Sequence, residues 1–123
     1  MKKILLVDDE KDFLLIIGEV LNEAGFQVVT ATNGIEAFRS VREEHPDLVI
    51  LDIVLPDIDG ETIYMKLKED PATNAIPVLF VSGVFSKEEA KRERHFLHDK
   101  KFLVKPFNRE ELLSKVNETL DER

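Results

Sequence analysis

The chain has 123 residues, the length of one domain, and it contains no cysteine, which excludes disulfides, thiolate nucleophiles and cysteine-based zinc sites. Its formal net charge of −8 argues against direct binding to nucleic acid, because contacts to phosphates need a basic face. No apolar run approaches the length of a membrane span, so we expect one soluble, cytoplasmic domain over residues 1–123.

Five short apolar runs, evenly spaced along the chain, are typical of buried strands. They cover residues 3–7, 26–30, 47–52, 77–81 and 101–104. The amphipathic stretches between and after them predict helices at about residues 12–24, 34–44 and 60–68, a fourth that begins at Ser86, and a fifth that begins at Asn108 and runs to about Leu120. This alternation is the pattern of a parallel sheet covered by helices on its faces.

Capping signals set several of the expected helix ends. Gly25 follows the first helix as a left-handed cap. Ser86 and Glu89 have the spacing of a capping box, and Asn108 stands three residues before Glu111 in the same relation.

The apolar positions predict which face of each helix packs on the sheet. The expected core residues are Phe13, Leu14, Ile17, Val20 and Leu21 in the first helix, Ile35, Phe38 and Val41 in the second, Ile63 and Leu67 in the third, and Leu112, Leu113, Val116 and Leu120 in the last.

With a right-handed connection at each crossover, the five strands predict an α/β fold, a doubly wound parallel sheet of order 2-1-3-4-5 like that of flavodoxin. In this order the first and third strands are neighbours at the topological switch point. Ligands of such folds bind there, beyond the carboxyl ends of the strands.

Three carboxylates should meet at that switch point. Asp8 and Asp9 follow the first strand, and Asp52 ends the third. Like charges placed side by side cost stability unless a cation lies among them, and oxygen ligands of this kind suit Mg²⁺. The sequence therefore predicts a magnesium site.

Two further strand ends supply a hydroxyl, Ser82, and a cation, Lys105. A carboxylate, a metal, a lysine and a hydroxyl are a set suited to phosphoryl transfer, with Asp52 as the acceptor. Taken singly, each of these residues is more commonly a cap, a turn residue or a surface side chain. Their joint position at the ends of four neighbouring strands favours the functional interpretation.

The acid pair "DD", "LDIVLPDIDG", "VSG" and "KPF" closely resemble the motifs of the response regulator receiver domain, and the resemblance runs from about Lys2 to Leu120. It implies a phosphoacceptor that takes a phosphoryl group onto Asp52 from a sensor histidine kinase or phosphotransfer protein, and that catalyses no reaction other than its own phosphorylation and dephosphorylation. Mg²⁺ would be bound by Asp9, Asp52 and the backbone carbonyl of Val54, and by Asp8 largely through a water.

The resemblance also implies a switch. Ser82 and Lys105 would contact the phosphoryl oxygens, and the surface of the fourth helix, fifth strand and fifth helix would then meet a partner or a second copy of the chain. Phe102 stands where the family keeps an aromatic that turns inward, although a strand Phe is otherwise simply core. A cis bond before Pro106 is implied as well, whereas from the sequence alone trans is the default.

The sequence departs from the family pattern in two places. His98 and Asp99 replace a Gly-Ala pair, which puts in doubt the glycine cap of the fourth helix and the shape of the output surface. Val54 and Val84 stand where the family varies its dephosphorylation rate, and neither can orient an attacking water. We therefore predict a slowly hydrolysing phosphoaspartate, whose lifetime Val84→Glu should shorten.

Rival interpretations fit less well. "DIDGE", residues 57–61, resembles the nucleophile motif of haloacid-dehalogenase phosphatases, but Pro56 and the earlier strand end place it in a loop. A calcium loop would need ligands at Leu55 and Lys66, and an FMN site needs a phosphate loop where this chain has acids. A pseudo-receiver, an interaction module without a working switch, stays open as the alternative.

Overall fold

The computed structural model describes residues 1–83 and 87–121, so the predictions at Ser86 and Val84 lie outside the described residues. The strands are β1 (Lys3–Val7), β2 (Gln27–Ala31), β3 (Leu48–Asp52), β4 (Val78–Ser82) and β5 (Phe102–Val104). The helices are α1 (Lys11–Glu23), α2 (Gly34–Glu44), α3 (Gly60–Glu69), α4 (Lys87–Leu97) and α5 (Arg109–Leu120).

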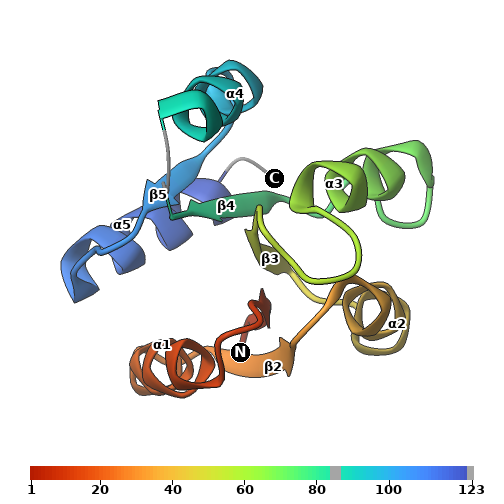
Figure 1. The fold of residues 1–123 in the computed structure, drawn as a ribbon. Helices are drawn as coiled ribbons and strands as arrows, with labels where there is room; N and C mark the ends of the chain where they lie inside the picture. The colour runs from red at the N-terminus through yellow and green to blue at the C-terminus, as the bar shows by residue number, and fades with distance from the viewer. Residues whose placement is uncertain (84–86, 122–123) are drawn as a thin grey trace.

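The strands form one parallel sheet of order β2-β1-β3-β4-β5, which confirms the predicted topology (Figure 1). In the register of the sheet, Val7 lies beside Leu51 and Asp52 lies beside Val81. The residues that follow β1, β3 and β4 therefore leave the sheet at the same edge, where the candidate site was expected.

Helices cover both faces of the sheet. Helices α1 and α5 lie on one face, and α2, α3 and α4 on the other (Figure 1). Because both faces are covered, the central strands are apolar at successive positions rather than alternating, and β3 and β4 are buried throughout. In the part of the chain that the structure describes, no helix is long and apolar enough to cross a membrane.

The predicted caps of α1 and α5 are confirmed. Gly25 has a φ of 97°, in the left-handed region that glycine enters without steric cost. The Asn108 side chain accepts a hydrogen bond from the Glu111 N–H, and the Glu111 carboxylate accepts one from the Asn108 N–H, which completes a capping box.

The predicted inner face of α2 is partly wrong. Val41 is buried and Phe38 packs at the edge of the core, but the Ile35 side chain is 65% exposed. Gly34 and Ala37 take the inner positions instead. A Cβ on Gly34 would lie 2.9 Å from the Ile58 Cβ, so the start of α2 approaches the loop after β3 too closely for a large side chain.

Helix α4 ends without the glycine that the family pattern places there. Its last residue is Leu97, and the Lys100 N–H donates to the Leu97 carbonyl at 2.9 Å. The Lys100 Nζ turns back to donate to the Phe96 carbonyl at 2.9 Å and lies 4.3 Å from the centre of the Phe96 ring. A lysine side chain thus caps a carbonyl of the last turn of this helix.

Candidate functional site

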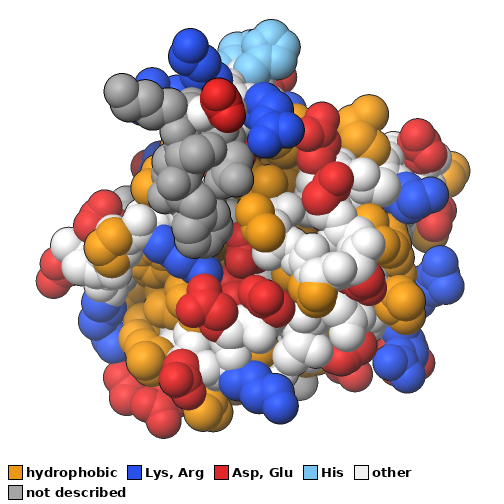
Figure 2. Space-filling view, in the orientation of Figure 1, with side chains coloured by type: hydrophobic (Ala, Val, Ile, Leu, Met, Phe, Trp, Pro, Cys, Tyr) orange, Lys and Arg blue, Asp and Glu red, His pale blue; other side chains and the backbone are white. Residues whose placement is uncertain are grey.

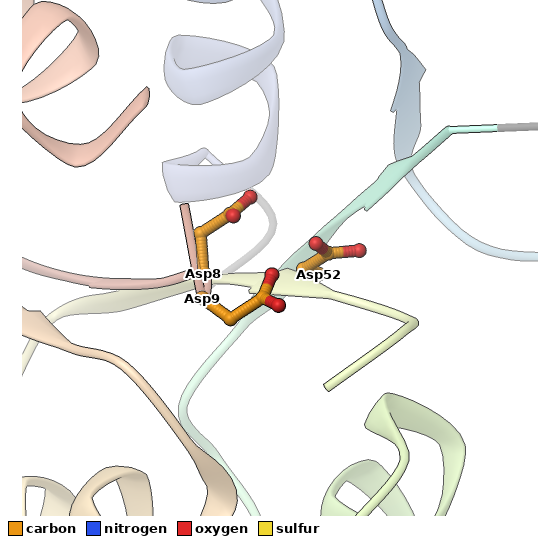
Figure 3. Close-up of side chains that lie close together, drawn as sticks. All are labelled: Asp8, Asp9 and Asp52. Atoms are coloured by element: carbon orange, nitrogen blue, oxygen red, sulfur yellow. The ribbon is translucent and has the colours of Figure 1, made fainter. Parts of the chain in front are cut away.

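Three aspartates from two strand ends converge as the sequence predicted. Asp8 and Asp9 follow β1 and Asp52 ends β3, and a carboxylate oxygen of each lies within 4.8 Å of the other two (Figure 3). The three carboxyl groups face a common space at the carboxyl edge of the sheet. The neighbouring positions of β1 and β3 in the sheet produce this convergence.

Backbone N–H groups hold two of these carboxylates in place. The Asp8 carboxylate is fully buried and accepts a hydrogen bond from the Glu10 N–H at 2.9 Å. The Asp52 carboxylate is almost as buried and accepts one from the Val54 N–H at 3.1 Å. Asp9 is exposed, so the cluster combines two buried acids with one open to solvent.

Lys105 brings a positive charge to the cluster. Its Nζ lies 2.9 Å from Asp8 and 3.7 Å from Asp52, and it stacks 4.2 Å from the centre of the Phe13 ring. The Lys105 N–H donates to the Ser82 carbonyl at 2.8 Å, which continues the pairing of β4 with β5. The peptide bond from Lys105 to Pro106 is cis, as the resemblance implied.

Burial and the neighbouring groups shift two pKa values at the site. Burial, together with the negative charge of Asp8, raises the pKa of Asp52 to about 7, although the Val54 N–H and Lys105 act in the opposite direction. Burial acts to lower the pKa of Lys105, but the hydrogen bond to Asp8 and the charges of Asp52 and Asp8 outweigh it and raise that pKa. The pKa of Asp52 therefore stays raised although the Lys105 Nζ lies 3.7 Å away.

The other predicted residues lie around this cluster. Val54 lines the same hollow as Asp9, Asp52 and Lys105, so its backbone stands at the rim of the site. Phe102 is half-buried against the core beside β4. Ser82 is buried at the end of β4.

Sequence reasoning missed two acidic neighbours. Glu10 is the third acid of the run after β1, and it pairs with the Lys105 Nζ at 3.1 Å. Glu93 projects from α4, and its carboxylate accepts a hydrogen bond from the Ser82 hydroxyl. The acidic run itself was a signal for Glu10, but no spacing rule relates Ser82 to Glu93, which belongs to a helix full of charged residues.

The loop between β3 and α3 is fixed by a third missed interaction. The Asp57 carboxylate accepts hydrogen bonds from the N–H groups of Gly34 and Ile35, at 2.7 and 3.1 Å, and so caps the start of α2. These bonds lower the pKa of Asp57. Asp57 is thus a structural residue, in agreement with the loop position expected for "DIDGE".

The arrangement fits a hard divalent cation. Acidic side chains gather near the middle of the face seen in Figure 2, with basic side chains beside them. Three carboxylates within 4.8 Å offer the oxygen ligands that Mg²⁺ prefers, and a cation beside Asp52 would offset the burial and the Asp8 charge that raise the pKa of Asp52. Because Asp9 is open to solvent, such a cation would keep sites for further oxygen ligands.

Comparisons with known proteins agree with this geometry. The family model for the response regulator receiver domain matches residues 4–117. Protein PilH of Pseudomonas aeruginosa is 33% identical, and the match covers 98% of each chain. The transcriptional regulatory protein PrrA of Mycobacterium tuberculosis is 36% identical over 98% of this chain but only 51% of PrrA. A CheY-like response regulator receiver domain protein from Methanospirillum hungatei has a similar structure, with a TM-score of 0.84, 30% identity, and coverage of 99% of this chain and 95% of that one.

Proposed function

This chain belongs to the response regulator receiver domain family, and on that premise we propose that it is a single receiver domain whose Asp52 accepts a phosphoryl group from a histidine of a partner protein. The observation that carries the proposal is the convergence of Asp8, Asp9 and Asp52 within 4.8 Å, with the Lys105 Nζ 3.7 Å from Asp52. The donor would be a sensor histidine kinase or a phosphotransfer protein.

In the proposed reaction an Asp52 oxygen attacks the phosphorus of the donor phosphohistidine. The new P–O bond forms as the P–N bond breaks, and the donor imidazole keeps the electron pair of that bond. Lys105, whose Nζ lies 3.7 Å from Asp52, would neutralise charge on the phosphoryl oxygens, and the Ser82 hydroxyl would turn to them. Mg²⁺, held by Asp9, Asp52 and the Val54 carbonyl, and by Asp8 through a water, would supply further charge neutralisation when bound.

Phosphorylation would act on the surface formed by α4, β5 and α5. A phosphoryl group on Asp52 adds negative charge and three acceptor oxygens that attract Ser82 and Lys105, and Phe102 in β5 would turn inward with Ser82. We propose that this surface then meets a partner protein or a second copy of the chain in the cytoplasm. Direct contact with nucleic acid is not part of the proposal, because the chain has a net charge of −8.

A mass measurement tests the assignment of the acceptor. The protein is incubated with Mg²⁺ and acetyl phosphate, and we expect the intact mass to rise by one phosphoryl group, with no such rise for Asp52→Ala. The matched control is Asp12→Ala, which removes an exposed aspartate from α1 and should leave the adduct in place.

Two outcomes would contradict the proposal. An adduct that forms equally well on Asp52→Ala would mean that another residue is the acceptor. If the wild-type protein takes no phosphoryl group from acetyl phosphate or from any phosphohistidine donor, the chain is a pseudo-receiver that acts by binding alone.

A further inference from the structure

The hydroxyl of Ser82 is bound by a residue outside the phosphorylation motifs. Ser82 ends β4 with only 2% of its surface exposed, and its hydroxyl donates to the carboxylate of Glu93, eleven positions along the chain in α4. The group that should contact a phosphoryl oxygen is therefore hydrogen-bonded to the helix of the proposed output surface.

The sheet holds the backbone of Ser82 in place, but rotation of its side-chain hydroxyl can change the acceptor of its hydrogen bond. The Ser82 carbonyl accepts from the Lys105 N–H at 2.8 Å, and the preceding residue, Val81, lies beside Asp52 in the sheet. A hydroxyl carries one hydrogen and turns easily about its C–O bond. It can donate to the Glu93 carboxylate or to a phosphoryl oxygen on Asp52, but not to both at once.

The position of Glu93 depends on the packing of α4. Its neighbours on the helix are Phe96, whose ring centre lies 5.1 Å from that of Phe80 in β4, and Leu97, which is buried. On its other side Glu93 lines a hollow between α4 and the loop after β3, together with Val54 and Arg92. This hollow, which Arg92, Asp59 and Glu61 also line, gives the Glu93 carboxylate room to leave Ser82.

From these contacts we infer that Glu93 is the positioning residue that couples Asp52 to α4. In the unphosphorylated protein it holds the Ser82 hydroxyl, and phosphoryl oxygens on Asp52 compete with it for that hydroxyl. When the Ser82 hydroxyl donates to a phosphoryl oxygen instead, the Glu93 carboxylate moves into the hollow, and α4 loses its hydrogen bond to the end of β4. The inference rests on the proposed function and adds to it the residue through which the site acts on α4.

Thermodynamic linkage predicts the direction in which removal of the Glu93 carboxylate changes the stability of the phosphoryl-bound state. If Glu93 competes with the phosphoryl group, removing its carboxylate must favour the phosphoryl-bound state by the same free energy that the bond contributes to the unbound state. A hydrogen bond to a charged group of this kind corresponds to a change in affinity of about tenfold.

The test uses beryllofluoride, a phosphoryl analogue, with Mg²⁺, and measures its affinity by calorimetry and fluorine NMR. We expect Glu93→Ala to bind it about tenfold more tightly than the wild type, and Glu93→Gln to lie between the two because its neutral amide is a weaker acceptor. The matched control is Glu88→Gln, which removes an exposed carboxylate from the same helix and should change the affinity less than twofold.

A double-mutant cycle distinguishes action through Ser82 from a general effect of charge. In a Ser82→Ala background the gain from Glu93→Ala should vanish, and a gain of equal size in both backgrounds would overturn the inference. Hydrogen exchange gives an independent readout, because we expect Glu93→Ala to speed exchange of the α4 amides in the free protein, and beryllofluoride to do the same in the wild type.

The possible failures are distinguishable. If the wild-type protein binds beryllofluoride and takes up a phosphoryl group but Glu93→Ala and Glu93→Gln leave the affinity unchanged, the inference is wrong and the proposed function stands. If the wild-type protein does neither, both are wrong.

Discussion

At Asp52, burial and a neighbouring charge act on the same carboxyl group. They raise its pKa from the ordinary 3.8 to about 7. Between pH 3.8 and about pH 7, Asp52 is therefore mostly protonated in the folded protein and mostly ionised in the unfolded chain. Because the folded state then binds more protons, its stability falls as pH rises from 4 to 7 and levels off above 7. Below pH 3.8 the carboxyl is protonated in both states and contributes nothing to this dependence.

We therefore expect Asp52→Asn to stabilise the protein in the absence of Mg²⁺, and to do so only above pH 4. The difference between a pKa of 3.8 and one of about 7 corresponds to roughly 4 kcal/mol in the free energy of unfolding at full ionisation. Urea unfolding at pH 4 and pH 8 measures the effect. A gain of the same size at both pH values would show that it arises from packing and not from the charge of Asp52.

The sequence predicted those site residues that stand at strand ends. Asp8, Asp9 and Asp52 could be placed together because strand order alone decides which loops share an edge of the sheet. The roles of Ser82 and Lys105 in phosphoryl contact stay predictions, although the structure brings Lys105 to the acids. Glu93 could not be predicted, because its contact depends on how far α4 lies from β4, which no local pattern encodes.

The first residue of α3, Gly60, lies too close to the end of β3 to carry a side chain. A Cβ on Gly60 would lie 2.5 Å from the Asp52 carbonyl oxygen and 2.7 Å from the Ile53 Cα, and both of these are backbone atoms that cannot turn aside. The Gly60 N–H donates to the Ile53 carbonyl at 2.7 Å, so the helix is bonded directly to the chain that follows β3.

We expect Gly60→Ala to lower the free energy of unfolding by about 1–3 kcal/mol, the usual range for an overpacked site, and to disturb the position of Asp52. Gly18→Ala in α1 is a control of opposite sign, because its Cβ would lie 3.9 Å from Val28 and a helical alanine is favoured over glycine by about 0.5–1 kcal/mol. Urea unfolding measures both changes. If Gly60→Ala were as stable as the wild type, the close approach of α3 to β3 would be disproved.

The end of α4 shows how a lysine replaces a glycine cap. Lys100 donates to the Phe96 carbonyl and to Asp99, both at 2.9 Å, and its Nζ also lies 5.4 Å from the centre of the Tyr64 ring. The replacement of the Gly-Ala pair by His98 and Asp99 therefore leaves the helix with a defined end. This end is held by side-chain contacts, which tie the last turn of α4 to α3.

Lys100→Met, which keeps most of the apolar stem but loses the charge, should lower the free energy of unfolding by about 1–2 kcal/mol. The comparison is Lys91→Met, which removes an exposed lysine from the same helix and should cost less than about 0.5 kcal/mol. Equal losses in guanidinium unfolding would show that Lys100 is an ordinary surface charge.

The elements themselves were largely predictable because apolar runs and caps are local signals. All five strands and five helices occur in the predicted order, and the capping box of α5 stands at Asn108. The exposed Ile35 was not predictable, because the inner stripe of α2 is made of small residues whose place depends on the approach of the loop after β3. Tertiary packing, not helical periodicity, decided which face turned inward.

The negative charge of the three clustered aspartates affects the stability of the whole domain. The chain carries a formal net charge of −8, and three of its acids lie within 4.8 Å of one another at one edge of the sheet that both cores share. A small domain of this size unfolds as one unit, so binding at that edge stabilises the entire fold. A cation held by the cluster relieves a local repulsion, whereas ions in solution only screen the net charge.

Magnesium should therefore raise the midpoint of thermal unfolding more than sodium chloride does at equal ionic strength. At a magnesium concentration about ten times its Kd the gain is roughly 1.4 kcal/mol, or about 5 °C for a domain of this length. Asp9→Asn removes one carboxylate from the cluster, so we expect this variant to be more stable than the wild type without magnesium and to lose most of the magnesium-specific gain. The stability curves of the two proteins should then cross as magnesium is added. Parallel curves that never cross would mean that magnesium acts by screening alone, and that the three aspartates do not form a binding site for it.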